Sequence, residues 1–287
     1  MTIEREAAAK LAALQSSLRD MGHVLVAFSG GVDSSFLLHA AVEVLGDRAV
    51  ALTTRSPTAP EEDEATARQL AAALAVPHLL IDANELEIPG YAANPVDRCY
   101  VCKGSLYEIC TAEARRLGIP HIVDGVNLDD LTDYRPGLRA AEERGIRHPL
   151  AEVGLTKEQI RLLSRRAGLP TADRPSSPCL SSRFPYGTPI TMDGLRKVAA
   201  AERVLRELGF RECRVRAHEP IARIEVPGDE VGRLASAEVR HAVVLAFKAI
   251  GFAYVTLDLQ GFRSGSLNET LPSAPGATRP TPDRQAS

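Results

Sequence analysis

Residues 24–35, with the sequence VLVAFSGGVDSS, decide the fold of this 287-residue chain. A short apolar run leads directly into two glycines, and apolar residues at helical spacing follow between Ser34 and Leu45. A buried strand, a sharp turn and a helix are therefore expected in succession. Adjacent glycines let the backbone turn tightly and approach a ligand closely, and a helix start offers unpaired N–H groups at its positive dipole end. The segment predicts a phosphate-binding loop.

The side chains of this loop suit ATP and Mg²⁺. Serine hydroxyls can donate hydrogen bonds to phosphate oxygens, and a carboxylate can hold Mg²⁺ against them. The loop has no lysine, so it is not the GxxxxGK[ST] nucleotide loop. A plain strand-to-helix turn capped by serine is the alternative, but the complete string between a strand and a helix favours ATP binding. The candidate ATP-binding residues are Ser29, Gly30, Gly31, Asp33, Ser34 and Ser35.

The first half of the chain alternates short apolar runs with helical patterns. This alternation is typical of a parallel sheet with helices on both faces, an α/β fold. Another helix is expected over 156–168, with Thr156 as its cap. The expected strands are 24–28, 49–53, 78–81 and 119–125.

A stretch rich in proline and serine, residues 169–187 (LPTADRPSSPCLSSRFPYG), interrupts all periodicity. After it, helices at 193–208 and 236–250 alternate with strands at 213–217, 221–226 and 253–259, which predicts a smaller α+β domain. We therefore expect three parts: an ATP-binding domain over 1–175, an α+β substrate and sulfur-transfer domain over 176–271, and a disordered tail over 272–287.

Composition excludes several classes. The net charge is −3, which gives no bulk signal for nucleic acid. No stretch reaches the roughly 20 apolar residues that span a bilayer, and the charged N-terminus resembles an amphipathic helix, so a cytoplasmic protein is expected. Five cysteines do not form a disulfide framework.

The cysteines fall into two groups. Cys110 and Cys213 lie at core spacing on an expected helix over 103–117 and on a strand, so both are expected to be buried. Cys99 and Cys102 form a CxxC motif in a segment rich in helix breakers, and Cys179 lies in the Pro/Ser stretch. Three thiolates can hold a 4Fe–4S cluster with one iron left open, which is our interpretation; a redox pair or a zinc site is the alternative.

The string SGGVDSS resembles the SGGxDS signature of the PP-loop ATP pyrophosphatases, an adenine nucleotide alpha hydrolase-like family with a Rossmann-like sheet. The resemblance implies cleavage of ATP to AMP and pyrophosphate, with adenylation of an acidic substrate. It also implies that the segment from Asp124 to Asn127, with Gly125, borders the nucleotide; a plain exit from a strand is the alternative.

Longer motifs narrow the resemblance. Residues 124–150, then 155–170, then PCLSSRFPYG at 178–187, resemble LarE, a family of ATP-dependent sulfur transferases in nickel-pincer nucleotide cofactor biosynthesis. The likeness extends to about Glu269 and implies that a carboxylate of pyridinium-3,5-biscarboxylic acid mononucleotide becomes a thiocarboxylate. It also implies a homo-oligomer.

The family has two sulfur routes. Some members give up the sulfur of the cysteine in the PCLSSR-like loop and keep dehydroalanine, and others add a CxxC and use a 4Fe–4S cluster that delivers sulfide. Cys99, Cys102 and Cys179 match the second kind. Sacrificial donation from Cys179 remains the alternative, and a sulfide source or sulfur donor is an expected partner.

The substrate residues are expected on the second domain's strands. Arg214 and Arg216 alternate with core residues, and Glu225 alternates on the partner strand. Arginine suits phosphate or carboxylate, although such a face can also be merely solvated. The LarE resemblance implies catalytic or substrate-binding roles for Arg214, Arg216 and Glu225. Weaker candidates are Arg263, for the substrate phosphate, and Arg183, which can instead pair with an acid.

Two rival functions remain from sequence alone. A PP-loop tRNA thiolase is the enzyme rival, and the acidic net charge counts against an RNA track. A nucleotide-binding regulator that senses ATP without turnover is the rival from another class.

Overall fold

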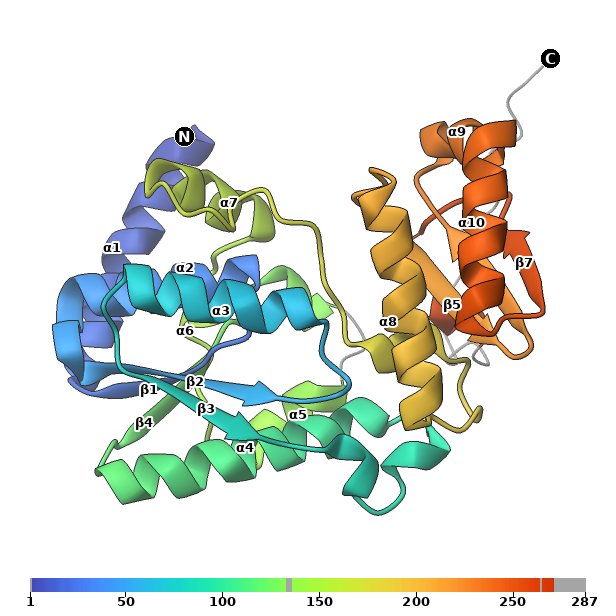
Figure 1. Ribbon diagram of the computed structural model, residues 1–287. Helices are drawn as coiled ribbons and strands as arrows, with labels where there is room; N and C mark the ends of the chain where they lie inside the picture. The colour runs from blue at the N-terminus through green and yellow to red at the C-terminus, as the bar shows by residue number, and fades with distance from the viewer. Residues whose placement is uncertain (1, 133–135, 264, 271–287) are drawn as a thin grey trace.

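The computed structural model describes residues 2–132, 136–263 and 265–270, and the tail expected over 272–287 lies outside these residues. Two sheets organise the chain (Figure 1). The first has four parallel strands in the order β3-β2-β1-β4. Its strands are β1 (Val24–Ala27), β2 (Ala49–Arg55), β3 (His78–Asp82) and β4 (His121–Asp124).

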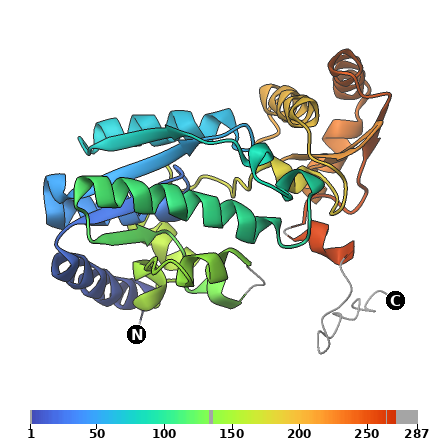
Figure 2. The ribbon, with the colours of Figure 1, turned by 90° about the horizontal axis from the view of Figure 1, so that it is seen from below.

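Helices cover both faces of this sheet, which confirms the expected α/β fold. Every residue of β1 is buried, and its side chains alternate between two cores. Val24 and Val26 pack in the core under α1, α2, α3 and α7, whereas Leu25 and Ala27 pack against α4. Figures 1 and 2 show α4 on the face opposite α2 and α3. The bounds are α1 (Ile3–Met21), α2 (Val32–Leu45), α3 (Glu61–Ala73), α4 (Arg98–Leu117), α5 (Pro136–Glu142), α6 (Pro149–Glu152) and α7 (Lys157–Arg166).

Local chemistry explains where the helices begin. The side chain of Thr156 accepts from the Gln159 amide at 3.3 Å, and Gln159 Oε1 accepts from the Thr156 amide at 3.2 Å, so α7 starts with a complete capping box. By contrast, the capping position of α2 is Gly31, which has no side chain to cap the first turn. Among the described residues, no side chain caps the first turn of α2, so its N–H groups can serve a ligand.

The second sheet has three strands in the order β5-β6-β7, with β5 and β6 antiparallel and β6 and β7 parallel. It has a core of its own, built with α8 and α10 around Phe210 and Phe247. The bounds are α8 (Met192–Glu207), β5 (Arg214–His218), β6 (Ile221–Glu225), α9 (Val231–Ala235), α10 (Ala237–Ile250) and β7 (Tyr254–Leu257).

A further apolar cluster joins the two parts. It packs Tyr91, from the segment before α4, against Leu180, Phe184 and side chains of α8 and β5, with Cys102 at its edge. The buried amide of Asn94 strengthens this junction by donating to the carbonyls of Phe184, Pro185 and Thr188 at 3.3, 2.7 and 3.1 Å. The chain that follows α7 thus packs against the chain that precedes α4. Among the described residues, no helix combines the length and the apolar character needed to cross a bilayer.

Candidate functional site

The glycine-rich loop lies where the strand order reverses. β2 follows β1 on one side and β4 pairs with it on the other, so the loops after β1 and β4 meet at a switch point, the usual ligand position in such sheets. Within the loop, the hydroxyls of Ser29 and Ser34 lie 3.2 Å apart, and Ser34 Oγ accepts from the Ser29 amide at 3.3 Å. Ser35 is fully buried in the next position of α2, away from solvent.

Glycine is needed at three positions of this region for different physical reasons. Gly30 has a φ of +73°, and a Cβ there would lie 2.8 Å from the Asp63 carbonyl oxygen on α3. Gly125 follows β4, and its Cβ would lie 2.7 Å from the Ser34 amide nitrogen. Gly31 is unstrained and would meet only Ser29 Oγ, at 3.3 Å. Gly30 and Gly125 therefore let the backbone pack closely, and Gly31 keeps the space over the loop open.

One carboxylate oxygen of Asp33 lacks a hydrogen-bond partner in the described part of the chain. Its Oδ2 forms an ion pair with Lys157 Nζ at the start of α7, whereas its Oδ1 is buried and has no hydrogen-bond partner among the described residues. Burial raises the pKa of Asp33, and the charge of Lys157 opposes that shift. An orphaned carboxylate oxygen beside a helix start fits Mg²⁺, which prefers oxygen ligands.

Sequence reasoning missed Lys157, which lies 124 positions from Asp33 in the chain. It also missed a polar network at the end of β4. Buried Asp124 accepts from Tyr107 Oη at 2.6 Å, from the Val126 amide at 3.1 Å, and contacts His148 Nδ1 at 2.6 Å. Burial acts to raise the pKa of Asp124, but the hydrogen bond with His148 and the charge of Lys103 outweigh it, so that pKa is lowered. Asp124 is therefore a fixed anion that holds the loop after β4.

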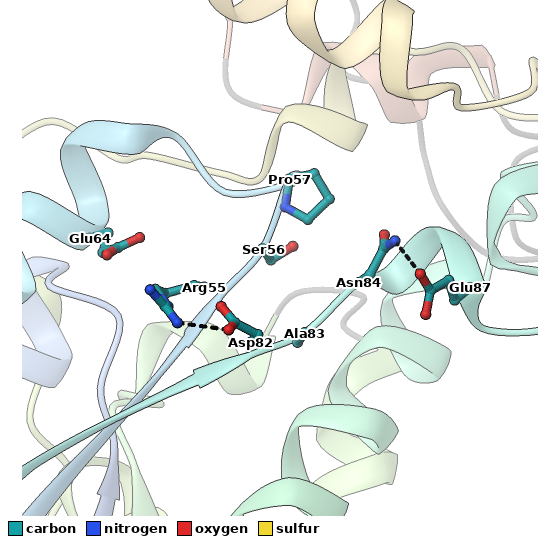
Figure 3. Close-up of a pocket in the computed structure, with 8 residues that line it drawn as sticks. All are labelled: Arg55, Ser56, Pro57, Glu64, Asp82, Ala83, Asn84 and Glu87. Carbon is teal, nitrogen blue, oxygen red and sulfur yellow. Dashed lines mark hydrogen bonds and ion pairs between the residues drawn. The ribbon is translucent and has the colours of Figure 1, made fainter.

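A recess of about 550 Å³ opens at the ends of β2 and β3 (Figure 3). The guanidinium of Arg55 pairs with Asp82 at 2.7 Å, and Asn84 donates to Glu87 at 2.8 Å. Its lining has three carboxylates and one guanidinium, which disfavours phosphate and suits hydroxyl or amino groups. The lining residues are Arg55, Ser56, Pro57, Glu64, Asp82, Ala83, Asn84 and Glu87.

The CxxC motif lies in a helix, so the irregular segment expected there is wrong. Helix α4 begins at Arg98, before both cysteines, and not near residue 103. The breakers Asn94 and Pro95 end just before it, and Asp97 takes the capping position, although its side chain makes no cap bond. Cys99 and Cys102 are thus three positions apart in the first turn, with Cys99 exposed and Cys102 half-buried.

The three thiols of interest share one neighbourhood without forming a ready metal site. Cys99 and Cys102 lie in the first turn of α4, and Cys102 packs at the edge of the apolar cluster that contains Leu180, the residue after Cys179. Burial raises the pKa of Cys102. Among the described residues, however, no group of three Cys, His, Asp or Glu side chains is arranged to hold a metal ion. As they lie, the three thiols are therefore not gathered around a single metal ion. Cys110 and Cys213 are buried on apolar faces.

The arginines expected on an open polar face are buried. The chain from Ser176 to Ser182 covers that side of the second sheet, which alternation along a strand cannot reveal. Arg216 pairs with Glu225 through two bonds of 3.0 and 2.8 Å, and Glu225 also accepts from Arg223 at 2.9 Å. Burial lowers the pKa of Arg214 to about 10, with the charge of Arg183 acting in the same direction.

Arg183 and Arg263 have different surroundings. Arg183 is buried and donates to Glu202 at 2.8 and 2.9 Å. Of the two roles expected for Arg183, substrate contact or pairing with an acid, the structure shows the acid pairing. Burial acts to raise the pKa of Glu202, but the charge of Arg183 outweighs it and lowers that pKa. Arg263 pairs with Glu269 and keeps 32% of its side chain exposed.

One polar contact set joins the glycine-rich loop to the Cys179 segment. Arg174 donates to the Gly30 carbonyl oxygen at 3.1 Å and to Asp63 at 2.6 Å. Asp63 also accepts from Ser177 Oγ at 3.0 Å. The nucleotide loop and the segment that carries Cys179 are therefore tied through two side chains.

Comparisons with known proteins show which family this chain resembles. Residues 8–89 match the family model described as NAD synthase. An uncharacterized protein of Synechocystis sp. is 44% identical over 262 residues, with 91% of this chain and 98% of that protein covered. The pyridinium-3,5-bisthiocarboxylic acid mononucleotide synthase of Lactiplantibacillus plantarum is 40% identical over 272 residues, with 94% and 98% covered.

The similarity to tRNA-modifying enzymes is more limited. The tRNA-specific 2-thiouridylase MnmA of Thermus thermophilus is 34% identical over 200 residues, which cover 55% of this chain and 53% of that enzyme. The synthase from Lactiplantibacillus plantarum instead aligns over almost its whole length. The chain therefore belongs to the LarE family of ATP-dependent sulfurtransferases, on a PP-loop fold.

Proposed function

We propose that this protein uses ATP to adenylate a carboxylate of pyridinium-3,5-biscarboxylic acid mononucleotide and converts it to a thiocarboxylate, as a step in nickel-pincer nucleotide biosynthesis. The main support is the set of hydrogen bonds that connects the glycine-rich loop to the segment with Cys179. Arg174 and Asp63 link the Gly30 carbonyl to Ser177, two residues before Cys179. A site that activates a carboxylate at one loop and attacks it from the other needs this proximity.

The glycine-rich loop is proposed to hold the phosphates of ATP. The start of α2 has no side-chain cap, and the hydroxyls of Ser29 and Ser34 lie together beside it, so N–H and O–H donors are available to a phosphate. Mg²⁺ would be held by Asp33 Oδ1 and would neutralise charge on the phosphates. Lys157 keeps the other oxygen of Asp33 in place. The recess in Figure 3 is proposed for the adenosine part of ATP, because its acidic lining suits hydroxyl and amino groups.

The chemistry balances in two transfers. A carboxylate oxygen of the substrate attacks the α-phosphorus of ATP, and pyrophosphate leaves. A sulfur nucleophile then attacks the carbonyl carbon of the acyl adenylate, the C–O bond to AMP breaks, and AMP leaves with the electron pair of that bond. Arg263 is the proposed contact for the phosphate of the mononucleotide, because its guanidinium reaches solvent.

The sulfur is proposed to come through Cys99, Cys102 and Cys179, as ligands of a 4Fe–4S cluster. The packing of Cys102 beside Leu180, next to Cys179, with Cys99 in the same helical turn as Cys102, supports this assignment.

The same geometry favours a second candidate, direct donation from Cys179. In that route the thiolate of Cys179 forms the bond to the acyl carbon. Removal of the proton on its Cα then breaks the Cβ–S bond, and dehydroalanine remains. Each chain would react once.

The test compares pyrophosphate release with the pyridinium mononucleotide, with tRNA, and with ATP alone. We expect release above the background with the mononucleotide only. Release with tRNA alone would favour a tRNA thiolase. This is the rival enzyme function, because about half of the chain is similar to MnmA. ATP binding without release under any condition would indicate a nucleotide-sensing regulator. We also propose that the protein forms a homo-oligomer and that its two domains comprise residues 1–175 and 176–271.

A further inference from the structure

The segment from Ser176 to Ser182, which carries Cys179, is held through its main-chain carbonyl groups by three buried arginines. Each guanidinium donates at least one hydrogen bond to this segment. These bonds are Arg214 Nη2 to Ser176 O at 2.6 Å, Arg183 Nη1 to Pro178 O at 2.8 Å and to Cys179 O at 3.1 Å, and Arg216 Nη1 to Ser182 O at 2.7 Å.

The arginines are themselves fixed in place. Their exposed fractions are 2% for Arg183, 7% for Arg214 and 6% for Arg216. Arg183 is held by Glu202, which also accepts from the Val215 amide at 3.0 Å, and Arg216 is held by Glu225. A planar guanidinium with one edge on a carboxylate presents its remaining donors in a fixed direction.

Arg214 is held differently from the other two. It donates to the Cys213 carbonyl at 2.7 Å and lies over the ring of Phe262, with 5.1 Å to the ring centroid. Among the described residues, no carboxylate lies within ion-pair distance of it. A buried cation without an ion-pair partner depends on its carbonyl acceptors, so Arg214 and the Cys179 segment stabilise each other.

The other side of the segment is attached to the first sheet. The Leu180 amide donates to the Thr58 carbonyl at 2.7 Å, just beyond the end of β2. The hydroxyl of Ser181 lies 2.8 Å from the buried hydroxyl of Tyr91. The segment therefore bridges two sheets, with its carbonyls toward the arginines and Cys179 between the attachments.

We propose that Arg183, Arg214 and Arg216 are positioning residues that hold Cys179 in place for sulfur transfer, and that they do not contact the substrate. This rests on the proposed function, in which Cys179 handles the sulfur. Their donors already serve the Cys179 segment, Glu202 and Glu225, and their side chains are closed to solvent. A substrate phosphate would have to displace those acceptors to reach them.

The test measures how fast iodoacetamide alkylates Cys179 when no substrate is present, with peptide mass spectrometry to separate the five cysteines. In Arg214→Met the Ser176 carbonyl loses its donor, the segment opens more often, and alkylation of Cys179 should be about tenfold faster or more. Labelling of Cys110, which lies on α4 at a buried position, should not change. The control is Arg233→Met, since Arg233 also donates to a carbonyl, Leu208 O at 3.0 Å, and lies over Phe210, away from the segment.

Kinetics separate positioning from substrate contact. Arg214→Met should keep the KM for the mononucleotide in pyrophosphate release, while the yield of thiocarboxylate per pyrophosphate falls. Arg214→Lys, which keeps a donor, should recover part of both readouts, and it also serves if the methionine variant does not fold. Unchanged alkylation of Cys179, or a KM raised about tenfold, would overturn the proposal.

The alkylation experiment needs no turnover. If the wild-type protein releases no pyrophosphate with the mononucleotide, the proposed function fails, whereas the alkylation rates still decide whether Arg214 holds the segment.

Discussion

Lys157 pairs with one oxygen of Asp33, and the other oxygen of that carboxylate is buried without a hydrogen-bond partner among the described residues. A buried acceptor left unsatisfied costs about 1–3 kcal/mol. The cost is removed when a cation binds there, since Mg²⁺ takes carboxylate oxygens as ligands. The pair of Lys157 and Asp33 therefore supports the proposed ATP site, in which this carboxylate would bind the metal ion.

Asp33→Ala should reduce pyrophosphate release at least about a hundredfold, because the variant loses the metal contact that steadies the phosphates. Its thermal unfolding temperature should not fall below that of the wild type, because the unsatisfied carboxylate oxygen is removed. The control is Asp47→Ala, beyond the other end of α2, where the side chain is exposed. Turnover of Asp33→Ala equal to that of the control would show that Asp33 does not serve the reaction.

The apo protein should show a pH dependence that comes from Asp33. Its folded pKa is raised above the ordinary 3.8, mainly by burial. Its contribution to stability is therefore fully present below pH 3.8 and is lost as the pH rises through the folded pKa. Asp33→Asn should thus be more stable than the wild type at pH 7, with the difference shrinking toward pH 4, since Lys157 is partly exposed and can stay hydrated. A difference that does not vary between pH 4 and 8 in thermal scans would contradict this assignment.

Alanine substitutions at the two neighbouring glycines of the loop should impair the protein for different reasons. Gly30→Ala forces a left-handed residue and a 2.8 Å contact with the Asp63 carbonyl, so it should lower the free energy of unfolding by about 2 kcal/mol or more. Gly31→Ala keeps an ordinary φ and meets only the Ser29 hydroxyl, at 3.3 Å, so it should lower stability less than Gly30→Ala and yet impair pyrophosphate release. Gly228→Ala, with no atom within 4 Å of the added carbon, is the control. Full activity in Gly31→Ala would mean that no phosphate lies over this loop.

The sequence predicts the first sheet and its loop because their determinants are local. Buried strands, glycines and helix starts occur within a few residues of one another, as in 24–35, and the strands at 24–27, 49–55, 78–82 and 121–124 follow the expected runs. The bounds of α4 were missed because Asn94 and Pro95 act as breakers just before the helix and not within it.

Long-range packing could not be predicted from these patterns. Alternation shows that Arg214 and Arg216 lie on the side of the strand away from its core, but it does not show that residues 176–182 cover that side. The ion pair of Lys157 with Asp33 joins two helices that are distant in sequence, and the sequence pattern of neither helix predicts it.

The two sulfur routes predict opposite results for cysteine variants. Protein prepared without oxygen and reconstituted with iron and sulfide should hold about four irons per chain. Replacing Cys99, Cys102 or Cys179 singly with serine should remove the iron, and replacing Cys110 or Cys213 should not, because those two are fully or almost fully buried on apolar faces. In the sacrificial route only Cys179 would matter, and intact-mass spectrometry after reaction would find a chain lighter by hydrogen sulfide.

The most direct test of the account is the mass of the mononucleotide after one anaerobic reaction with ATP, Mg²⁺ and the wild-type protein. The account predicts a product in which one carboxylate oxygen has been replaced by sulfur, formed together with equal amounts of AMP and pyrophosphate. A mononucleotide of unchanged mass, recovered while AMP and pyrophosphate accumulate, would contradict sulfur transfer to this substrate.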